Sequence, residues 1–184
     1  GAGVLDCRKA LQAHDGDFEK AVAYLREKGL AAAARKAGRE AREGVVELYA
    51  HGGGRVGVMV EVNCETDFVA RTDQFRNFAH EVALQIAANN PRYVAESEIP
   101  AAVLENERDE ARKRAAHEDK PPSVLDKMVE GRVQKFLDEI CLLRQPYIRD
   151  DQKTVQQLLQ ETVITTGENV LIRRFERWEL GEQV

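Results

Sequence analysis

The sequence has little of what metal centres and disulfide scaffolds need. It contains three cysteines in 184 residues, Cys7, Cys64 and Cys141, and their spacing fits no zinc pattern. Its four histidines are scattered, with no pair at the i, i+4 spacing of a metal-binding helix. An odd number of cysteines is typical of reduced thiols in the cytosol. We therefore expect a cytoplasmic chain that binds no metal and no cofactor.

Long apolar runs and an excess of positive charge are also missing. No apolar stretch approaches the roughly 20 residues of a membrane span. The net charge is −5, whereas a face for nucleic acid would shift the balance towards positive charge. We expect no membrane span and no direct contact with RNA or DNA. Because the sequence begins at Gly1 rather than at a methionine, it leaves open whether a leader precedes it.

The first 40 residues predict a small helical domain followed by a linker. The apolar stripe of the first helix consists of Val4, Leu5, Ala10 and Leu11. Asp15 or Asp17 can cap a second helix, and Gly29 is placed to end it. Two short helices cannot close a core, so we expect a third helix upstream of Gly1. Residues 30–43 are rich in alanine and predict a helical linker.

The pattern then changes to the two-residue period of β-strands, which indicates a second domain over residues 41–184. Residues 45–49 and 56–62 predict a β-hairpin around a glycine turn. The side chains expected to face the core are Val56, Val58, Val60 and Val62. A third strand follows at residues 169–180, after several helices. The fold class is therefore α+β, with a three-stranded antiparallel sheet.

Between the second and third strands, the pattern of two consecutive helices predicts a helical hairpin that protrudes into solvent. Residues 100–118 are polar all round, and a long helix follows the Pro121-Pro122 break. Ser123 and Asp126 match a capping box for this long helix.

The other two helices each carry an apolar stripe at helical spacing. One has a continuous apolar face and begins at Thr72 or Asp73. The other opens with a capping box of Thr154 and Gln157 and ends at Gly167.

The last strand is apolar on both faces. A strand in a sheet with one solvated side should be polar on its outer face. By simple alternation the two faces are Val170, Ile172, Trp178 and Leu180 on one side, and Leu171 and Phe175 on the other. Something is therefore expected to cover the second face. A second copy of the chain and the long helix from Ser123 are both open as covers.

The segment between the valine strand and the next helix carries an unusual polar and aromatic mixture. Residues 63–71 read Asn-Cys-Glu-Thr-Asp-Phe-Val-Ala-Arg. Spacing alone favours a hydrophobic staple, in which Phe68 or Val69 folds back onto the helix start. The alternative is an exposed aromatic anchor that binds another protein.

Five blocks of this sequence resemble, in the same order, signatures of the elongation factor Ts family. They are residues 1–3 with 6–11, residues 61–70 with their Thr-Asp-Phe-Val-Ala run, residues 127–132, residues 145–147, and residues 167–169 with 172–174. One short match would be weak, but five in order are hard to attribute to chance.

The resemblance implies a guanine nucleotide exchange factor for elongation factor Tu, and not an enzyme. It implies that Val4 and Leu5 contact the G domain of this partner. It places Thr66, Asp67, Phe68 and Val69 near the partner's magnesium site, with Phe68 as a wedge. The chain resembles the short form of the family, with one core unit, and such members are similar in forming homodimers.

Two other readings of the sequence compete with this one. The N-terminal residues also resemble a ubiquitin-associated adaptor, but the family shares that helical fold in its first domain, and fold is not function. An adaptor would leave residues 41–184 unexplained. Cys64 could instead be an enzyme's nucleophile, although no histidine is adjacent to it, and a cysteine at a strand end is more often a buried apolar residue.

Overall fold

The structure, a computed structural model, describes residues 3–118 and 120–182; Gly1 and Ala2, which open the first family block, lie outside them. The helices are α1 (Val4–Ala13), α2 (Phe18–Lys36), α3 (Asp67–Ala70), α4 (Asp73–Asn89), α5 (Ala101–Ala115), α6 (Pro122–Ile140) and α7 (Val155–Thr166). Short 3-10 helices lie at Glu96–Glu98 and Leu142–Arg144. The strands are β1 (Glu43–His51), β2 (Val56–Cys64), β3 (Pro146–Tyr147), β4 (Asp150–Thr154) and β5 (Leu171–Glu179).

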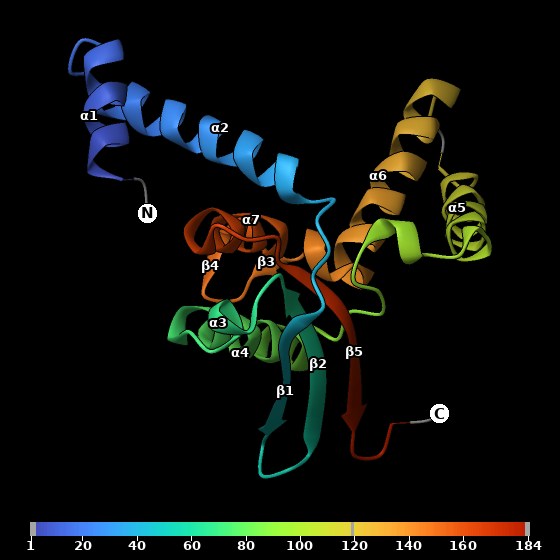
Figure 1. Ribbon diagram of the computed structural model, residues 1–184. Helices are drawn as coiled ribbons and strands as arrows, with labels where there is room; N and C mark the ends of the chain where they lie inside the picture. The colour runs from blue at the N-terminus through green and yellow to red at the C-terminus, as the bar shows by residue number, and fades with distance from the viewer. Residues whose placement is uncertain (1–2, 119, 183–184) are drawn as a thin grey trace.

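Helices α1 and α2 form an arm, residues 4–36, that leaves the body on one side (Figure 1). Asp17 caps α2 by accepting a hydrogen bond from the Lys20 amide. The prediction that Gly29 ends this helix is wrong, because α2 continues to Lys36 and includes most of the expected linker. The alanines that follow outweigh one glycine, which costs a helix only about 1 kcal/mol. Gly29 lies where α2 crosses α7, and a Cβ there would come within 2.9 Å of Ile164 Cδ1.

Strands β1, β2 and β5 form the expected antiparallel sheet, in the order β1-β2-β5. Val58, Val60 and Val62 are buried on its inner face, as their alternation predicts, whereas Val56 is half-buried. Gly44 is required at its position in β1, because a Cβ there would lie 2.0 Å from the Val62 carbonyl oxygen.

A β-bulge at Arg173 changes which side chains of β5 share a face. Ile172 pairs with Val62, but the next pair is Arg174 with Glu61, so Arg173 is an extra residue. The simple alternation expected for this strand is therefore wrong beyond Ile172. Phe175 faces the core opposite Val60, and Trp178 lies on the opposite side from Ile172.

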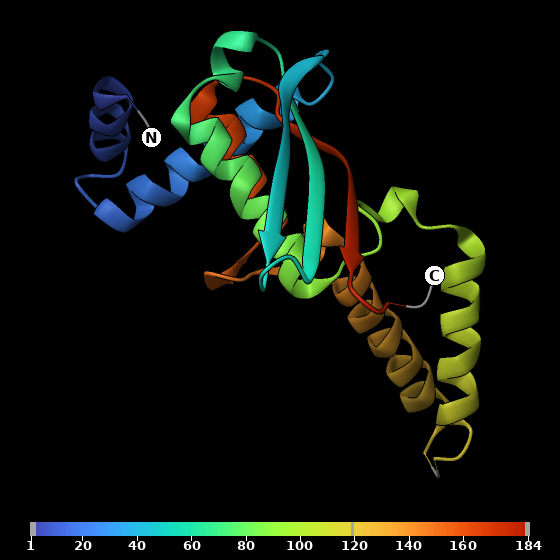
Figure 2. The same cartoon turned by 90° about the horizontal axis from the view of Figure 1, so that it is seen from below.

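The bulge leaves an apolar surface on the side of the sheet away from the core. We call the side chains of Val46, Leu48, Met59 and Trp178 the outer face; their exposed fractions are 59%, 71%, 47% and 78%. Of the two covers left open by the sequence, the long helix from Ser123 does not cover this face, since these exposures leave it open within the described part of the chain. Figure 2 shows α6 to one side of the sheet rather than across it.

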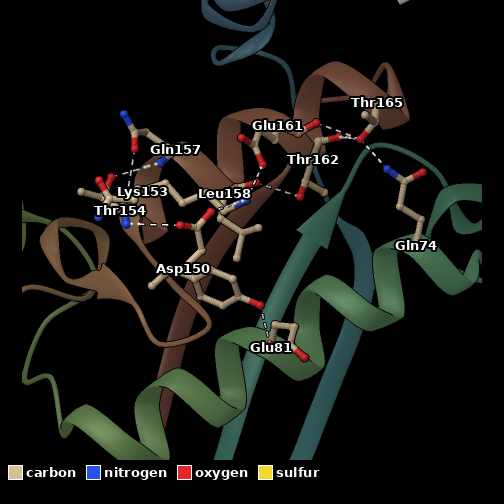
Figure 3. Close-up of polar contacts among 12 residues, drawn as sticks. Gln74, Glu81, Asp150, Lys153, Thr154, Gln157, Leu158, Glu161, Thr162 and Thr165 are labelled. Atoms are coloured by element: carbon tan, nitrogen blue, oxygen red, sulfur yellow. Dashed lines mark hydrogen bonds and ion pairs between the residues drawn. The ribbon is translucent and has the colours of Figure 1, made fainter. Parts of the chain in front are cut away.

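The inner face of the sheet is covered by α4, and α7 packs against α4. Thr72 caps α4 through the Phe75 amide, and Thr154 and Gln157 form the predicted capping box of α7. Figure 3 shows polar contacts between these helices, including one from Gln74 on α4 to the Thr165 hydroxyl on α7. Together the sheet and the two helices build the main core.

Helices α5 and α6 form the predicted hairpin and protrude on the side opposite the arm (Figures 1 and 2). The capping box of Ser123 and Asp126 is absent: α6 begins at Pro122, with Pro121 as the N-cap and no side-chain cap. A proline fits the first helical turn because its fixed φ suits the helix and it has no N–H to satisfy. Strands β3 and β4 form a second, two-stranded sheet that the sequence pattern did not predict.

Candidate functional site

The segment singled out by its aromatic residue folds as a single helical turn between β2 and α4. Thr66 caps this turn, α3, by accepting a hydrogen bond from the Val69 amide through its hydroxyl, at 3.3 Å. We call residues 65–70 the Phe68 turn. Its backbone is short, so its conformation depends on what holds its two ends.

The two apolar side chains of the turn point in opposite directions. Val69 is 7% exposed and belongs to the main core, whereas Phe68 is 78% exposed. Val69 therefore packs in the core, whereas Phe68 stands in solvent, as the alternative reading requires. An exposed phenylalanine on a structured turn is available to fill a pocket of another protein.

Asp67 lies beside Phe68 and is also exposed. Its carboxylate forms an ion pair with Arg71 at 2.8 Å, between side chains that are 61% and 74% exposed. Exposed pairs of this kind contribute only about 0–1 kcal/mol. Asp67 can therefore exchange Arg71 for another cationic group at little cost.

Two carboxylates tie the Phe68 turn to the segment that follows α7. Glu168 accepts hydrogen bonds from the amides of Glu65 and Thr66, at 3.1 and 3.0 Å, and from the Thr66 hydroxyl at 2.6 Å. In return, Glu65 accepts a hydrogen bond from the Asn169 amide at 2.6 Å. The result is a reciprocal clamp, defined here as Glu65, Thr66, Glu168 and Asn169.

Cys64, at the end of β2, does not have the character of a nucleophile. Its side chain is fully buried. Burial, with a further contribution from the negative charge of Glu168, raises the pKa of the Cys64 thiol to about 11. The thiol stays protonated near neutral pH and donates a hydrogen bond to the Thr66 carbonyl at 3.2 Å. This argues against the enzyme reading built on Cys64.

Val4 and Leu5, the other predicted contact residues, lie on α1 and are 86% and 63% exposed. Both views show α1 well separated from α3 (Figures 1 and 2). The structure thus brings Thr66, Asp67, Phe68 and Val69 together on one turn but keeps Val4 and Leu5 apart from them. A partner that touches both regions has to be large.

The rest of the described chain offers no obvious site for chemistry. Within residues 3–118 and 120–182, no group of three His, Cys, Asp or Glu side chains is placed to hold a metal ion. Over the same residues, no helix has the length and apolar character to cross a membrane. A hollow between α5 and α6, lined by Ala111, Ala115 and Gly131 among others, is open to solvent and lies on the hairpin, away from Phe68.

Sequence reasoning missed Glu168 and Asn169 as members of the site, and it included Glu65 only as part of the segment 63–71, without a role. The only available signal was the Gly167-Glu168-Asn169 block, and Gly167 already had an explanation as a helix cap. Contacts across more than 100 residues of sequence separation have no local pattern.

The fold and the turn define an α+β protein with one exposed aromatic side chain on a clamped turn. The sequence profile described as Elongation factor TS matches residues 15–182. Proteins named Elongation factor Ts from Thermoanaerobacter sp. (strain X514) and Caldanaerobacter subterraneus subsp. tengcongensis are 59% and 58% identical. Each alignment covers all of this chain, and 90% and 92% of the relative. The chain belongs to the elongation factor Ts family and is a translation elongation factor.

Proposed function

We propose that this chain is a guanine nucleotide exchange factor for elongation factor Tu, acting in the cytoplasm without bond-breaking chemistry of its own. It binds the GDP-bound and the nucleotide-free partner, and it prefers the second. The observation that carries this proposal is the 78% exposure of Phe68 on a turn whose first two residues, Glu65 and Thr66, are held by the clamp. The family membership supplies the partner.

The mechanism is thermodynamic linkage between two ligands of one partner. A factor that binds nucleotide-free elongation factor Tu more tightly must weaken GDP binding by the same ratio. A shift of about 10⁴ requires about 5.5 kcal/mol of differential binding. Burying one phenylalanine provides about 1.5–3 kcal/mol, so Phe68 needs other contacts beside it.

The other contacts are assigned as follows. Phe68 wedges between side chains of the partner, and Asp67 helps to displace the elements that hold the magnesium ion and phosphates. Thr66 and Val69 shape the turn that presents them. Val4 and Leu5 dock on the G domain, and both side chains are exposed on α1, where a partner can reach them.

We also propose that two copies of the chain associate through the outer face. Four large apolar side chains on one sheet surface are an unusual cost for a monomer in water. A two-fold interface needs only one self-complementary patch, so a second copy can cover this surface.

The direct experiment is stimulated release of labelled GDP from elongation factor Tu. Addition of the chain should accelerate release in proportion to its concentration until the partner is saturated. Immobilised ubiquitin is the parallel test of the adaptor reading and should retain none of the chain. Retention on ubiquitin together with unchanged GDP release would reverse the assignment.

A further inference from the structure

We propose that Glu168 is a positioning residue for nucleotide exchange, which holds the Phe68 turn in its binding-competent conformation. This inference rests on the proposed function and adds to it a residue that does not itself touch the partner's nucleotide site. Glu168 acts through the backbone of the turn.

The contacts of Glu168 are unusually complete for a half-buried side chain. One oxygen, Oε2, accepts hydrogen bonds from the amides of Glu65 and Thr66, and the other, Oε1, accepts one from the Thr66 hydroxyl. These donors belong to the two residues directly before α3. Hydrogen bonds to an ionised carboxylate are about twice as strong as neutral ones. A single side chain thus fixes the entry to the turn.

The reciprocal bond prevents the two segments from sliding past each other. The Glu65 carboxylate, 23% exposed, accepts the Asn169 amide at 2.6 Å and lies 3.5 Å from the Arg39 guanidinium. Each segment therefore supplies both a carboxylate and backbone donors to the other.

Glu168 itself comes from a well-anchored element. Gly167 ends α7 in the left-handed conformation, with φ at 75°, and this turn directs Glu168 towards the Phe68 turn. One helical turn earlier, Thr165 accepts a hydrogen bond from Gln74 in the first turn of α4 (Figure 3). The Phe68 turn lies directly before α4, so the segment from Thr165 to Asn169 contacts the chain both before and after the turn.

Phe68 has no such anchor of its own. Its side chain is 78% exposed, so its position is inherited from the backbone of residues 66–69. A helix of a single turn is not stable by itself. Without Glu168 the turn has to be ordered when the partner binds, and that ordering weakens association. This is why an internal carboxylate influences an intermolecular reaction.

The experiment is a double-mutant cycle of Glu168→Ala with Phe68→Ala, read as the second-order rate constant for stimulated GDP release. Glu168→Ala alone should lower this constant by about tenfold or more, because preorganisation is lost. Glu168→Gln, which keeps an acceptor for the two amides, should stay within about threefold of the wild type. In the Phe68→Ala background, Glu168→Ala should change the constant by less than about twofold, the usual error of additivity.

A matched control separates positioning from simple loss of stability. Thr154→Ala removes the cap at the far end of α7, where Thr154 accepts the Gln157 amide, and does not touch the Phe68 turn. It should lower the melting temperature but leave the exchange constant within about twofold. If Glu168→Ala does not fold, Glu168→Asp takes its place, since its shorter side chain cannot reach all three donors.

Amide hydrogen exchange in the free protein measures how firmly the clamp holds the turn when no partner is present. Glu168→Ala should increase exchange at the Val69 and Ala70 amides by about tenfold or more while the amides of α4 keep their protection. The inference would be overturned if the Val69 and Ala70 amides kept their protection in Glu168→Ala. It would also be overturned if Glu168→Ala lowered the rate constant for GDP release equally with and without Phe68, or if Glu168→Gln lowered it as much as Glu168→Ala. If the wild-type chain did not accelerate GDP release from elongation factor Tu, or if Phe68→Ala left the rate constant unchanged, the proposed function would be refuted instead.

Discussion

At the scale of single residues, Phe68 is exposed where most phenylalanines are buried. Its side chain gives nothing to the core of the free protein, whereas its neighbour Val69 is inside it. The free energy that Phe68 provides is therefore available only when a partner covers it. Folding and binding can be separated at this position more cleanly than at a half-buried one.

Phe68→Ala should lower the rate constant for stimulated GDP release by about tenfold to a hundredfold, the equivalent of about 1.5–3 kcal/mol. The melting temperature should stay within about 2 °C of the wild type, because little apolar area leaves the core. Stopped-flow release of fluorescent GDP and thermal melting monitored by circular dichroism measure the two effects.

Asp67→Ala is the companion to that measurement. It removes a charge that is only weakly engaged by Arg71, so its effect on GDP release should have the same direction but be smaller. A larger effect for Asp67 than for Phe68 would mean that electrostatic displacement, rather than the aromatic wedge, drives release.

At the scale of elements, the inner face of the sheet carries the stability. Val60→Ala should destabilise the protein by about 1–3 kcal/mol, because Val60 is fully buried between α4 and its strand neighbours. For a chain of this size that corresponds to a fall in melting temperature of about 2–4 °C for each kcal/mol. Val124→Ala on α6, where the side chain is 39% exposed, is the control and should melt close to the wild type.

The arm should behave in the opposite way. Leu5→Ala is expected to weaken complex formation with elongation factor Tu more than it lowers the melting temperature, since Leu5 is 63% exposed on α1. Calorimetric titration gives the dissociation constant, and melting gives the stability. If the loss of stability equals the loss of binding free energy, Leu5 packs within its own small domain.

Elements with strong local patterns were predictable from the sequence, and those fixed by distant contacts were not. The valine alternation and the Thr154 capping box are local and were found where the sequence puts them. Gly29 has the local pattern of a helix end, because the close approach of α2 to α7 that requires a glycine there leaves no mark in the neighbouring sequence. The bulge at Arg173 was missed for a similar reason: strand pairing decides it. The clamp around Glu168 depends on such distant contacts too.

At the scale of the whole molecule, the chain just after the arm and the Phe68 turn are both bonded to the segment that follows α7. The Asn169 side-chain amide donates to the Arg39 carbonyl at 2.7 Å, just beyond α2, while the Asn169 backbone amide donates to Glu65. Asn169 is thus one link between the arm and the Phe68 turn, in addition to the packing of α2 against α7. Two linked contacts bind a large partner more tightly than either does alone, provided that the spacing between them fits.

The outer face concerns the molecule as a whole, because its apolar side chains come from all three strands. Val46 and Leu48 lie on β1, Met59 on β2 and Trp178 on β5. Trp178 stands opposite Gly57, whose missing side chain leaves the indole uncovered. Charged side chains share this side of the sheet: Glu61, paired with Arg174 at 2.8 Å, stands opposite Val46, and Glu176 stands opposite Met59. A second copy that covers this face must also pair these charges, because an unpaired buried charge is costly.

Trp178→Glu should therefore convert a dimer into a monomer. In sedimentation equilibrium at micromolar concentration, the wild type should have about twice the chain mass of 20.7 kDa, and the variant should have the mass of one chain. Because Trp178 is 78% exposed within the chain, the helical circular dichroism signal of the variant should be unchanged. Val124→Glu, at an exposed position on α6, replaces an apolar side chain by the same charge away from the sheet and should leave the dimer intact. A wild type that sediments as a single chain would rule out this interface and make its complex with elongation factor Tu one-to-one.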